Sequence, residues 1–232
     1  MFVRTRIKVC CIASADEAAA AVASGADAIG LVGRMPSGPG PIPDERIAAI
    51  ATMLPPPIAG FLLTSETSAE AIADHVRRTG VSTVQIVSHL GPRDSAELAR
   101  LLPSVRRVQV IHVENRRVLD LIDVYANHVH AFLLDSGRPG AAVPELGGTG
   151  RVHDWDLSRA FVEVSPHPVF LAGGLTPENV GRAIRHVRPF GVDLCNGVRV
   201  AGRLNRERLT AFAEAVQAAD GALVGRATAL KR

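Results

Sequence analysis

Short apolar runs alternate with alanine-rich stretches along nearly the whole chain, and this alternation constrains the fold more than any other feature. Apolar runs of this length, bounded by polar or glycine-containing segments, are typical of strands buried on both faces. Eight such runs predict strands: Ile7–Cys10, Ala28–Val32, Ile58–Leu63, Thr83–Val87, Val108–His112, Ala131–Asp135, Val169–Ala172 and Val192–Cys195.

The stretches between these runs predict helices. Several start at a capping residue, as in the sequence Ser14-Ala-Asp-Glu17, and some end at a glycine, as at Gly25 and Gly80. The eight helix candidates are Ser14–Ser24, Asp44–Met53, Ser68–Thr79, Asp94–Leu101, Asn115–Ala126, Trp155–Val164, Pro177–Val187 and Arg206–Ala219. Eight strands paired with eight helices in 232 residues predict an α/β fold, a single-domain (β/α)8 TIM barrel over residues 1–220, with 221–232 as a loose C-terminal tail.

Composition agrees with such a barrel and excludes several classes of function. The chain is 47% hydrophobic but only 4% aromatic, so Val, Ile, Leu and Ala fill the core. The net charge of +3 is spread over scattered arginines without a basic, aromatic-studded stripe, which argues against nucleic-acid binding. No segment approaches the ~18 apolar residues that span a membrane, and the first residues contain no secretory signal. A cytoplasmic protein without a membrane partner is expected.

The three cysteines, Cys10, Cys11 and Cys195, favour a reducing compartment. An odd count with two adjacent residues is a poor disulfide framework. They lack the spacing to other ligands that a metal site requires, so no metal is expected. The histidine pair His128 and His130 lacks a third ligand nearby and is read in the same way.

Two glycine turns follow the last two predicted strands. Ala172-Gly173-Gly174 comes directly after one strand, and Asn196-Gly197 follows the other. Glycines at the carboxyl end of a strand allow backbone N–H groups to approach a ligand closely, and a helix N-terminus favours an anion. Two such turns after strands 7 and 8 of a barrel indicate a phosphate site. The expected partner is therefore a phosphorylated small molecule.

Cys10 and Asp135 are the residues best placed for chemistry, because each closes a predicted strand and projects into the mouth of the barrel. A thiol and a carboxyl that face one site can serve as general base and general acid. The alternative for Cys10 is a small buried hydrophobe, the commoner fate of a free cysteine. For Asp135, burial at the end of an apolar strand is unfavourable without a task or a partner.

Six motifs, in order, resemble the phosphoribosylanthranilate isomerase family from about residue 6 to 218. They are Lys8-Val-Cys-Cys-Ile12, Gly25-Ala-Asp-Ala-Ile-Gly30, Val84-Gln-Ile86, Leu133-Leu-Asp-Ser136, Gly147-Gly-Thr-Gly150 with Asp154-Trp155, and Leu171-Ala-Gly-Gly-Leu-Thr-Pro-Glu-Asn-Val180. The resemblance implies an Amadori rearrangement in tryptophan biosynthesis that uses no metal or organic cofactor.

By motif match, Asp135 resembles the general acid of that family and Cys10, as thiolate, its general base. The resemblance also implies a phosphate site on backbone N–H groups. Its residues would be Gly148, Gly173, Gly174, Asn196 and Gly197. Gln85 is expected to point into the barrel, where it hydrogen-bonds a ligand or a buried polar neighbour.

The chain departs from the family pattern at the base and on the loop after strand 2. Cys11 stands where the family has glycine, and its Cβ crowds the turn if φ is positive. Gly40 stands where the family carries an arginine that holds the anthranilate carboxylate. Glycine cannot replace a guanidinium fork, so another arginine has to substitute, and Arg34 and Arg199 are the candidates.

Two further departures lie at the ends of strands 4 and 8. Val87 and Ser88 replace the family's His-Gly, and Arg199 reverses the charge of its glutamate. Three interpretations remain open: a divergent phosphoribosylanthranilate isomerase, a paralogue that isomerises another phosphorylated sugar amine, or a sugar-phosphate-binding barrel without catalysis. Both a monomer and a homodimer fit the sequence.

Overall fold

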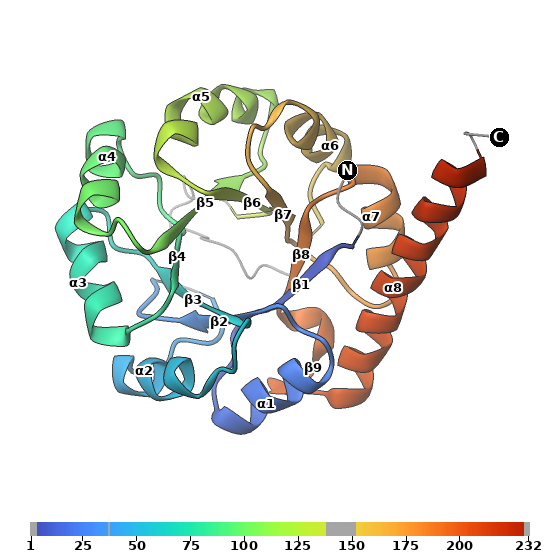
Figure 1. The fold of residues 1–232 in the computed structure, drawn as a ribbon, viewed down its shortest axis with the longest axis horizontal. Coiled ribbons are helices and arrows are strands. Elements are labelled where there is room, and N and C mark those ends of the chain that lie inside the picture. Colours follow the sequence, from blue (N-terminus) through green and yellow to red (C-terminus); the bar gives the residue numbers. More distant parts are fainter. Residues whose placement is uncertain (1–3, 37, 138–151, 230–232) are drawn as a thin grey trace.

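Eight parallel strands close into a barrel in the computed structural model, which describes residues 4–36, 38–137 and 152–229 (Figure 1). The strands are β1 (Arg6–Val9), β2 (Ala28–Val32), β3 (Ala59–Thr64), β4 (Thr83–Ile86), β5 (Arg106–His112), β6 (Ala131–Asp135), β7 (Val169–Leu171) and β8 (Gly191–Leu194). Pairing of β1 with β8, from Arg6 opposite Gly191 to Val9 opposite Leu194, closes the ring. The predicted barrel is confirmed.

Helices surround the barrel, each following the strand of the same number (Figure 1). They are α1 (Ala15–Ala23), α2 (Asp44–Met53), α3 (Ala69–Thr79), α4 (Pro92–Leu101), α5 (Leu121–Tyr125), α6 (Trp155–Val164), α7 (Val180–Val187) and α8 (Arg206–Ala229). A short antiparallel pair, β9 (Arg199–Val200) with β10 (Arg203–Leu204), separates β8 from α8.

The strands alternate their side chains between two apolar layers, as the period of two requires. On β5, Val108 and Val110 pack inside the barrel. Ile111, on the other face, packs in the larger layer between strands and helices. Because both faces are buried, the strands are mostly apolar, and the polar side chains inside them, Lys8, Gln85, Gln109 and Asp193, are buried.

Two helices differ most from their predicted bounds, and four others differ by one to three residues at an end. The predicted helix 115–126 is broken, because the Asn115 side chain accepts a hydrogen bond from the Arg117 backbone N–H and starts a 3-10 turn at Arg116–Asp120 before α5. At the other end, α8 continues to Ala229, so residues 221–229 are helical and not a loose tail. Buried Ala219 and partly buried Leu223 pack that helix against the core. Within the described residues, no helix combines the length and apolarity that crossing a membrane requires.

Candidate active site

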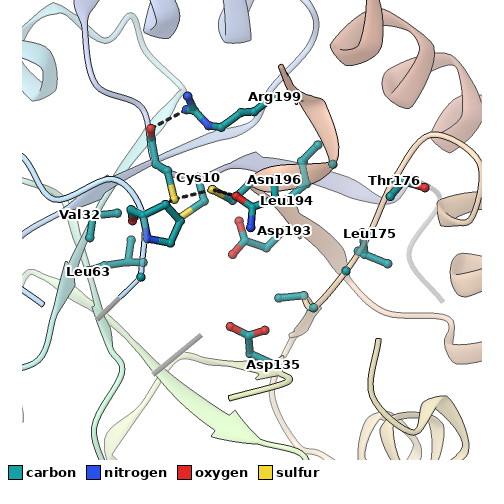
Figure 2. Close-up of a pocket in the computed structure, with 18 of the residues that line it drawn as sticks. Cys10, Val32, Leu63, Asp135, Leu175, Thr176, Asp193, Leu194, Asn196 and Arg199 are labelled. Carbon is teal, nitrogen blue, oxygen red and sulfur yellow. Dashed lines mark hydrogen bonds between the residues drawn. The ribbon is translucent and has the colours of Figure 1, made fainter. Parts of the chain in front are cut away.

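A cavity of about 390 Å³ opens where the carboxyl ends of the strands meet (Figure 2). In a (β/α)8 barrel this is the end at which active sites form. The structure brings most of the predicted site residues together on its wall: Cys10, Gln85, Asp135, Gly173, Gly174, Asn196, Gly197 and Arg199. Arg34 does not line the cavity and is exposed to solvent. Gly148 lies outside the described residues.

Cys10 and Asp135 approach the cavity from different strands. Cys10 directly follows β1 and is only 5% exposed, whereas Asp135 ends β6 and is partly buried. Figure 2 shows Asp193 between them. Asp135 Oδ1 accepts a hydrogen bond from the backbone N–H of Ser136 (2.7 Å), which fixes the carboxylate at the strand end. A thiol and two carboxyls therefore face one enclosed space.

A buried ion pair supports the thiol from within the barrel. Lys8 lies two residues before Cys10 on β1, and its Nζ contacts Asp193 Oδ1 on β8 at 2.8 Å. Burial disfavours the ammonium, but the negative charges of Asp193 and Cys10 outweigh it, so the pKa of Lys8 lies above its ordinary value. Burial, reinforced by the charge of Asp135, raises the pKa of Asp193 despite its contact with Lys8.

The neighbouring thiol and this lysine both favour the thiolate of Cys10. The pKa of Cys10 lies below the ordinary value of a thiol, chiefly because the Cys11 side chain hydrogen-bonds it. Burial acts in the opposite direction, and the positive charge of Lys8 then lowers the pKa further. The pKa of Cys11 is raised well above its ordinary value, because this thiol is hydrogen-bonded to Cys10 and Cys195 and is buried. Of these two neighbouring thiols, Cys10 is the one that ionises first.

The turns after β7 and β8 need their glycines. Gly173 and Gly174 have φ of 80° and 62°, a left-handed conformation that glycine adopts without strain. A Cβ at Gly197 would lie 2.0 Å from the carbonyl oxygen of Leu175, so the two turns touch through bare backbone. Asn179 closes the first turn, since its Oδ1 accepts from the Thr176 N–H (2.9 Å) and its Nδ2 donates to the Gly174 carbonyl (2.8 Å). These glycine turns, residues 173–174 and 196–197, form one corner of the cavity and are here called the glycine cradle.

Cys11 has φ of 60°, so its Cβ does crowd the turn beside Cys10. A left-handed conformation costs a non-glycine residue roughly 1–2 kcal/mol. The Cys11 Sγ lies 2.6 Å from the Sγ of Cys195 and 3.7 Å from the Pro39 carbonyl oxygen. Cysteine at this position therefore joins the turn after β1 to the end of β8 and to the loop after β2.

Arg199 lines the cavity, but its guanidinium binds protein groups. It forms a bidentate pair with Glu17, with both N–O distances at 3.1 Å, and donates to the Cys11 carbonyl (2.5 Å; Figure 2). Arg208, which the sequence analysis did not select, also lines the cavity, and its Nε donates to the Gly197 carbonyl (3.0 Å). The expectation that Arg199 supplies a free cation to a ligand has no support in this geometry.

Sequence reasoning also missed Lys8 and Asp193 as members of the site. Each is a charged residue inside an otherwise apolar strand, and burial of a charge without a partner is strongly unfavourable. That contrast was available in the sequence, although the pairing of β1 with β8 was needed to show that the two residues meet.

In the described part of the chain, no group of three or more His, Cys, Asp or Glu side chains is arranged to hold a metal ion. The cavity instead combines an ionisable thiol, two carboxyls and a glycine cradle at the carboxyl ends of a closed ring of strands. Fold and site together define a (β/α)8-barrel protein equipped for acid–base chemistry on a small molecule.

Comparison with known proteins narrows this class. The model of the N-(5'-phosphoribosyl)anthranilate (PRA) isomerase family matches residues 7–215. N-(5'-phosphoribosyl)anthranilate isomerase 2 of Methanosarcina mazei is 40% identical over 195 residues, covering 84% of this chain and 85% of the relative. The chain therefore belongs to the PRA isomerase family.

Solved structures agree in fold over almost the whole barrel. The crystal structure of phosphoribosyl anthranilate isomerase from Thermotoga maritima matches with a TM-score of 0.79 and 28% identity, covering 92% of this chain and 99% of that one. A structure of the enzyme in complex with reduced 1-(o-carboxyphenylamino)-1-deoxyribulose 5-phosphate matches with a TM-score of 0.76 and 26% identity, with the same coverage.

Proposed function

We propose that this member of the family catalyses the Amadori rearrangement of N-(5'-phosphoribosyl)anthranilate to 1-(o-carboxyphenylamino)-1-deoxyribulose 5-phosphate, with Asp135 as general acid and Cys10 as general base. The observation that carries the proposal is that Cys10, Asp135 and the glycine cradle line one cavity. A thiol held toward its thiolate form and a carboxyl on another strand suit proton transfers at two different atoms of one substrate.

The reaction moves protons without an external oxidant or reductant. Asp135 protonates the furanose ring oxygen, the C1–O bond breaks, and the nitrogen lone pair forms an iminium at C1. The Cys10 thiolate then removes the C2 proton, which gives an enolamine. Tautomerisation of the enolamine to the ketone returns a proton to C1, so C1 is reduced while C2 is oxidised. The balance explains why no cofactor is needed.

Two groups of residues on the cavity wall are suited to bind the substrate. We assign the phosphate to the backbone of Gly173, Gly174 and Gly197 and to Asn196, and to Gly148 beyond the described residues. Gln85 is 3% exposed, and its Oε1 finds no hydrogen-bond partner within the described residues. An unpaired buried acceptor on the cavity wall is suited to a hydroxyl or N–H of the ligand. A thiolate base also requires a reducing compartment, which fits a cytoplasmic enzyme.

The test is the decay of N-(5'-phosphoribosyl)anthranilate fluorescence after addition of purified protein, combined with melting temperatures in inorganic phosphate. Turnover that saturates with substrate, with phosphate both competing and raising the melting temperature, supports the proposal. Stabilisation by phosphate without turnover would instead indicate a sugar-phosphate-binding barrel. Turnover confined to another phosphorylated sugar amine would indicate a paralogue with a rebuilt aromatic subsite.

A further inference from the structure

The turn that follows β1, residues 10–13, is held from outside the barrel by one partly buried ion pair, Arg199 with Glu17. Arg199 Nη2 donates to the Cys11 carbonyl (2.5 Å), and the same nitrogen contacts Glu17 Oε2 (3.1 Å). Glu17 Oε2 in turn accepts the backbone N–H of Ala13 (3.0 Å). The pair therefore binds one backbone carbonyl, that of Cys11, and one backbone N–H, that of Ala13, in the turn that begins with Cys10.

The other half of the pair reaches the segment after β8. Arg199 Nη1 contacts Glu17 Oε1 (3.1 Å) and donates to the Gly202 carbonyl (3.0 Å). Glu17 Oε1 also accepts the backbone N–H of Leu204 (3.1 Å). The side chain of Arg199 is only 9% exposed, so water does little to screen this contact. One ion pair thus joins the turn after β1, helix α1 and the β9–β10 hairpin.

This turn needs external support, because Cys11 adopts a left-handed conformation that a non-glycine residue does not favour. The carbonyl that Arg199 holds belongs to that same residue. Cys10 immediately precedes it, so rotation of the Cys11 backbone would reorient the Cys10 thiol relative to the cavity.

We propose that Arg199 and Glu17 are a positioning pair, which holds the Cys10–Cys11 turn so that the Cys10 thiol faces Asp135, and that Arg199 does not bind substrate. The inference rests on the proposed role of Cys10. Nη1 and Nη2 of Arg199 are both engaged by a carboxylate and two carbonyls, and only its buried Nε–H lacks a partner among the described residues. A single N–H cannot form the fork that binds a ligand carboxylate. The positioning role also explains why position 199 is an arginine. Its partner Glu17 lies on α1, beside the turn that has a cysteine in place of glycine.

The decisive experiment is a double-mutant cycle between Arg199→Met and Cys11→Gly, read by kcat and KM separately and by the rate of Cys10 alkylation with iodoacetamide, resolved by peptide mass spectrometry. Glycine at position 11 adopts a positive φ without strain, so the turn no longer needs the Arg199–Glu17 pair, here called the clamp, to hold it. Arg199→Met is expected to lower kcat on the order of tenfold with KM changed less than about threefold, in line with misplacement of a reacting group. It is also expected to change the Cys10 alkylation rate. In the Cys11→Gly background both effects should shrink to within about twofold.

Matched variants keep the test sharp. Arg203→Met removes an exposed arginine of the same hairpin and should leave all readouts unchanged. Arg199→Lys keeps the charge but loses the fork, so it should fold and still lower kcat. A KM increase of tenfold or more at constant kcat would show that Arg199 binds substrate, and an undiminished loss with Cys11→Gly would show that it does not act through Cys11. Either result overturns the proposal. If the wild type shows no turnover but Cys10 alkylation follows the cycle, the clamp stands and the proposed function fails.

Discussion

Cys11 occupies the space that a side chain at position 40 would need. A Cβ built on Gly40 would lie 2.7 Å from the Cys11 Cβ and 3.1 Å from its Sγ. Gly40 also has φ of 92°, which excludes most other residues. A cysteine at position 11 and a side chain larger than hydrogen at position 40, the sites of two departures from the family pattern, therefore compete for the same space.

The close contact between positions 11 and 40 predicts that Gly40→Ala destabilises the protein and that Cys11→Gly restores part of the lost stability. The steric clash and the left-handed backbone together should lower the free energy of unfolding by roughly 2–4 kcal/mol. In the Cys11→Gly background only the backbone term remains, about 1–2 kcal/mol. Urea unfolding of the four proteins measures this. Equal losses in both backgrounds would show that the two residues do not compete for space.

The thiol of Cys11 should control the ionisation of Cys10. Removing the hydrogen bond with Cys11→Ala raises the pKa of Cys10, so alkylation of Cys10 should need a higher pH. Cys11→Ser retains a donor and should stay close to the wild type. The pH dependence of iodoacetamide labelling, followed on the Cys10 peptide, measures the shift. The same pH midpoint of Cys10 labelling in all three proteins would show that the Cys11 thiol does not control the ionisation of Cys10.

The buried pair Lys8–Asp193 predicts an asymmetric response to mutation. Lys8→Met leaves the Asp193 carboxylate buried without its partner, which should cost about 3–5 kcal/mol of stability. The double variant Lys8→Met/Asp193→Asn removes both charges and should recover at least half of that loss. Chemical denaturation at neutral pH distinguishes the two. If the double variant is no more stable than Lys8→Met, the unpaired charge of Asp193 is not the cause of the lost stability.

His153 makes the stability depend on pH. Burial lowers its pKa from 6.5 to about 4. Ser158 Oγ donates to the Asp154 carbonyl and contacts His153 Nε2 at 2.7 Å, so Nε2 carries the proton, while Nδ1 is buried and meets no partner among the described residues. Because the unfolded chain binds the proton more tightly than the folded protein, the contribution of His153 to stability is fully present above pH 6.5. It decreases as the pH falls from 6.5 to 4.

For His153 that loss should reach on the order of 1–3 kcal/mol by pH 4. Urea midpoints of the wild type and of His153→Gln, measured from pH 7.5 to 4, give the difference due to this residue. The variant should have a flatter profile over this interval, although other buried histidines keep some slope in both proteins. Parallel profiles would contradict the burial of a neutral imidazole at this position.

The fold was predictable because the signals of its elements are local: apolar runs mark the strands, and capping residues and glycines mark the helix ends. The bounds of Ala28–Val32, Asp44–Met53 and Trp155–Val164 agree with the prediction to the residue. The errors occur where side chains and tertiary packing override periodicity. The Asn115 side chain initiates a 3-10 turn in a predicted helix, and packing of Leu223 prolongs α8 past its predicted end.

The site was predictable in part. Cys10 and Asp135 stand out because a polar residue that ends an apolar strand must face the barrel mouth. The role of Arg199 was not predictable, because its partner Glu17 lies 182 positions away and the two meet only when β8 closes onto β1. A charged residue that lines a cavity can equally bind a ligand or the protein, and only the contacts distinguish these cases.

Cys10 and Asp135 are assigned as the base and the acid of one reaction, and a comparison of kcat for Cys10→Ala, Asp135→Asn and the wild type decides whether they are. Steady-state decay of N-(5'-phosphoribosyl)anthranilate fluorescence, with melting temperatures to show that both variants fold, is the measurement. Each substitution should lower kcat by about 10²–10⁴-fold while KM stays within a few-fold, because general acid–base catalysis is lost and binding is kept. Wild-type kcat in either folded variant would show that the substituted residue is not the catalytic acid or base.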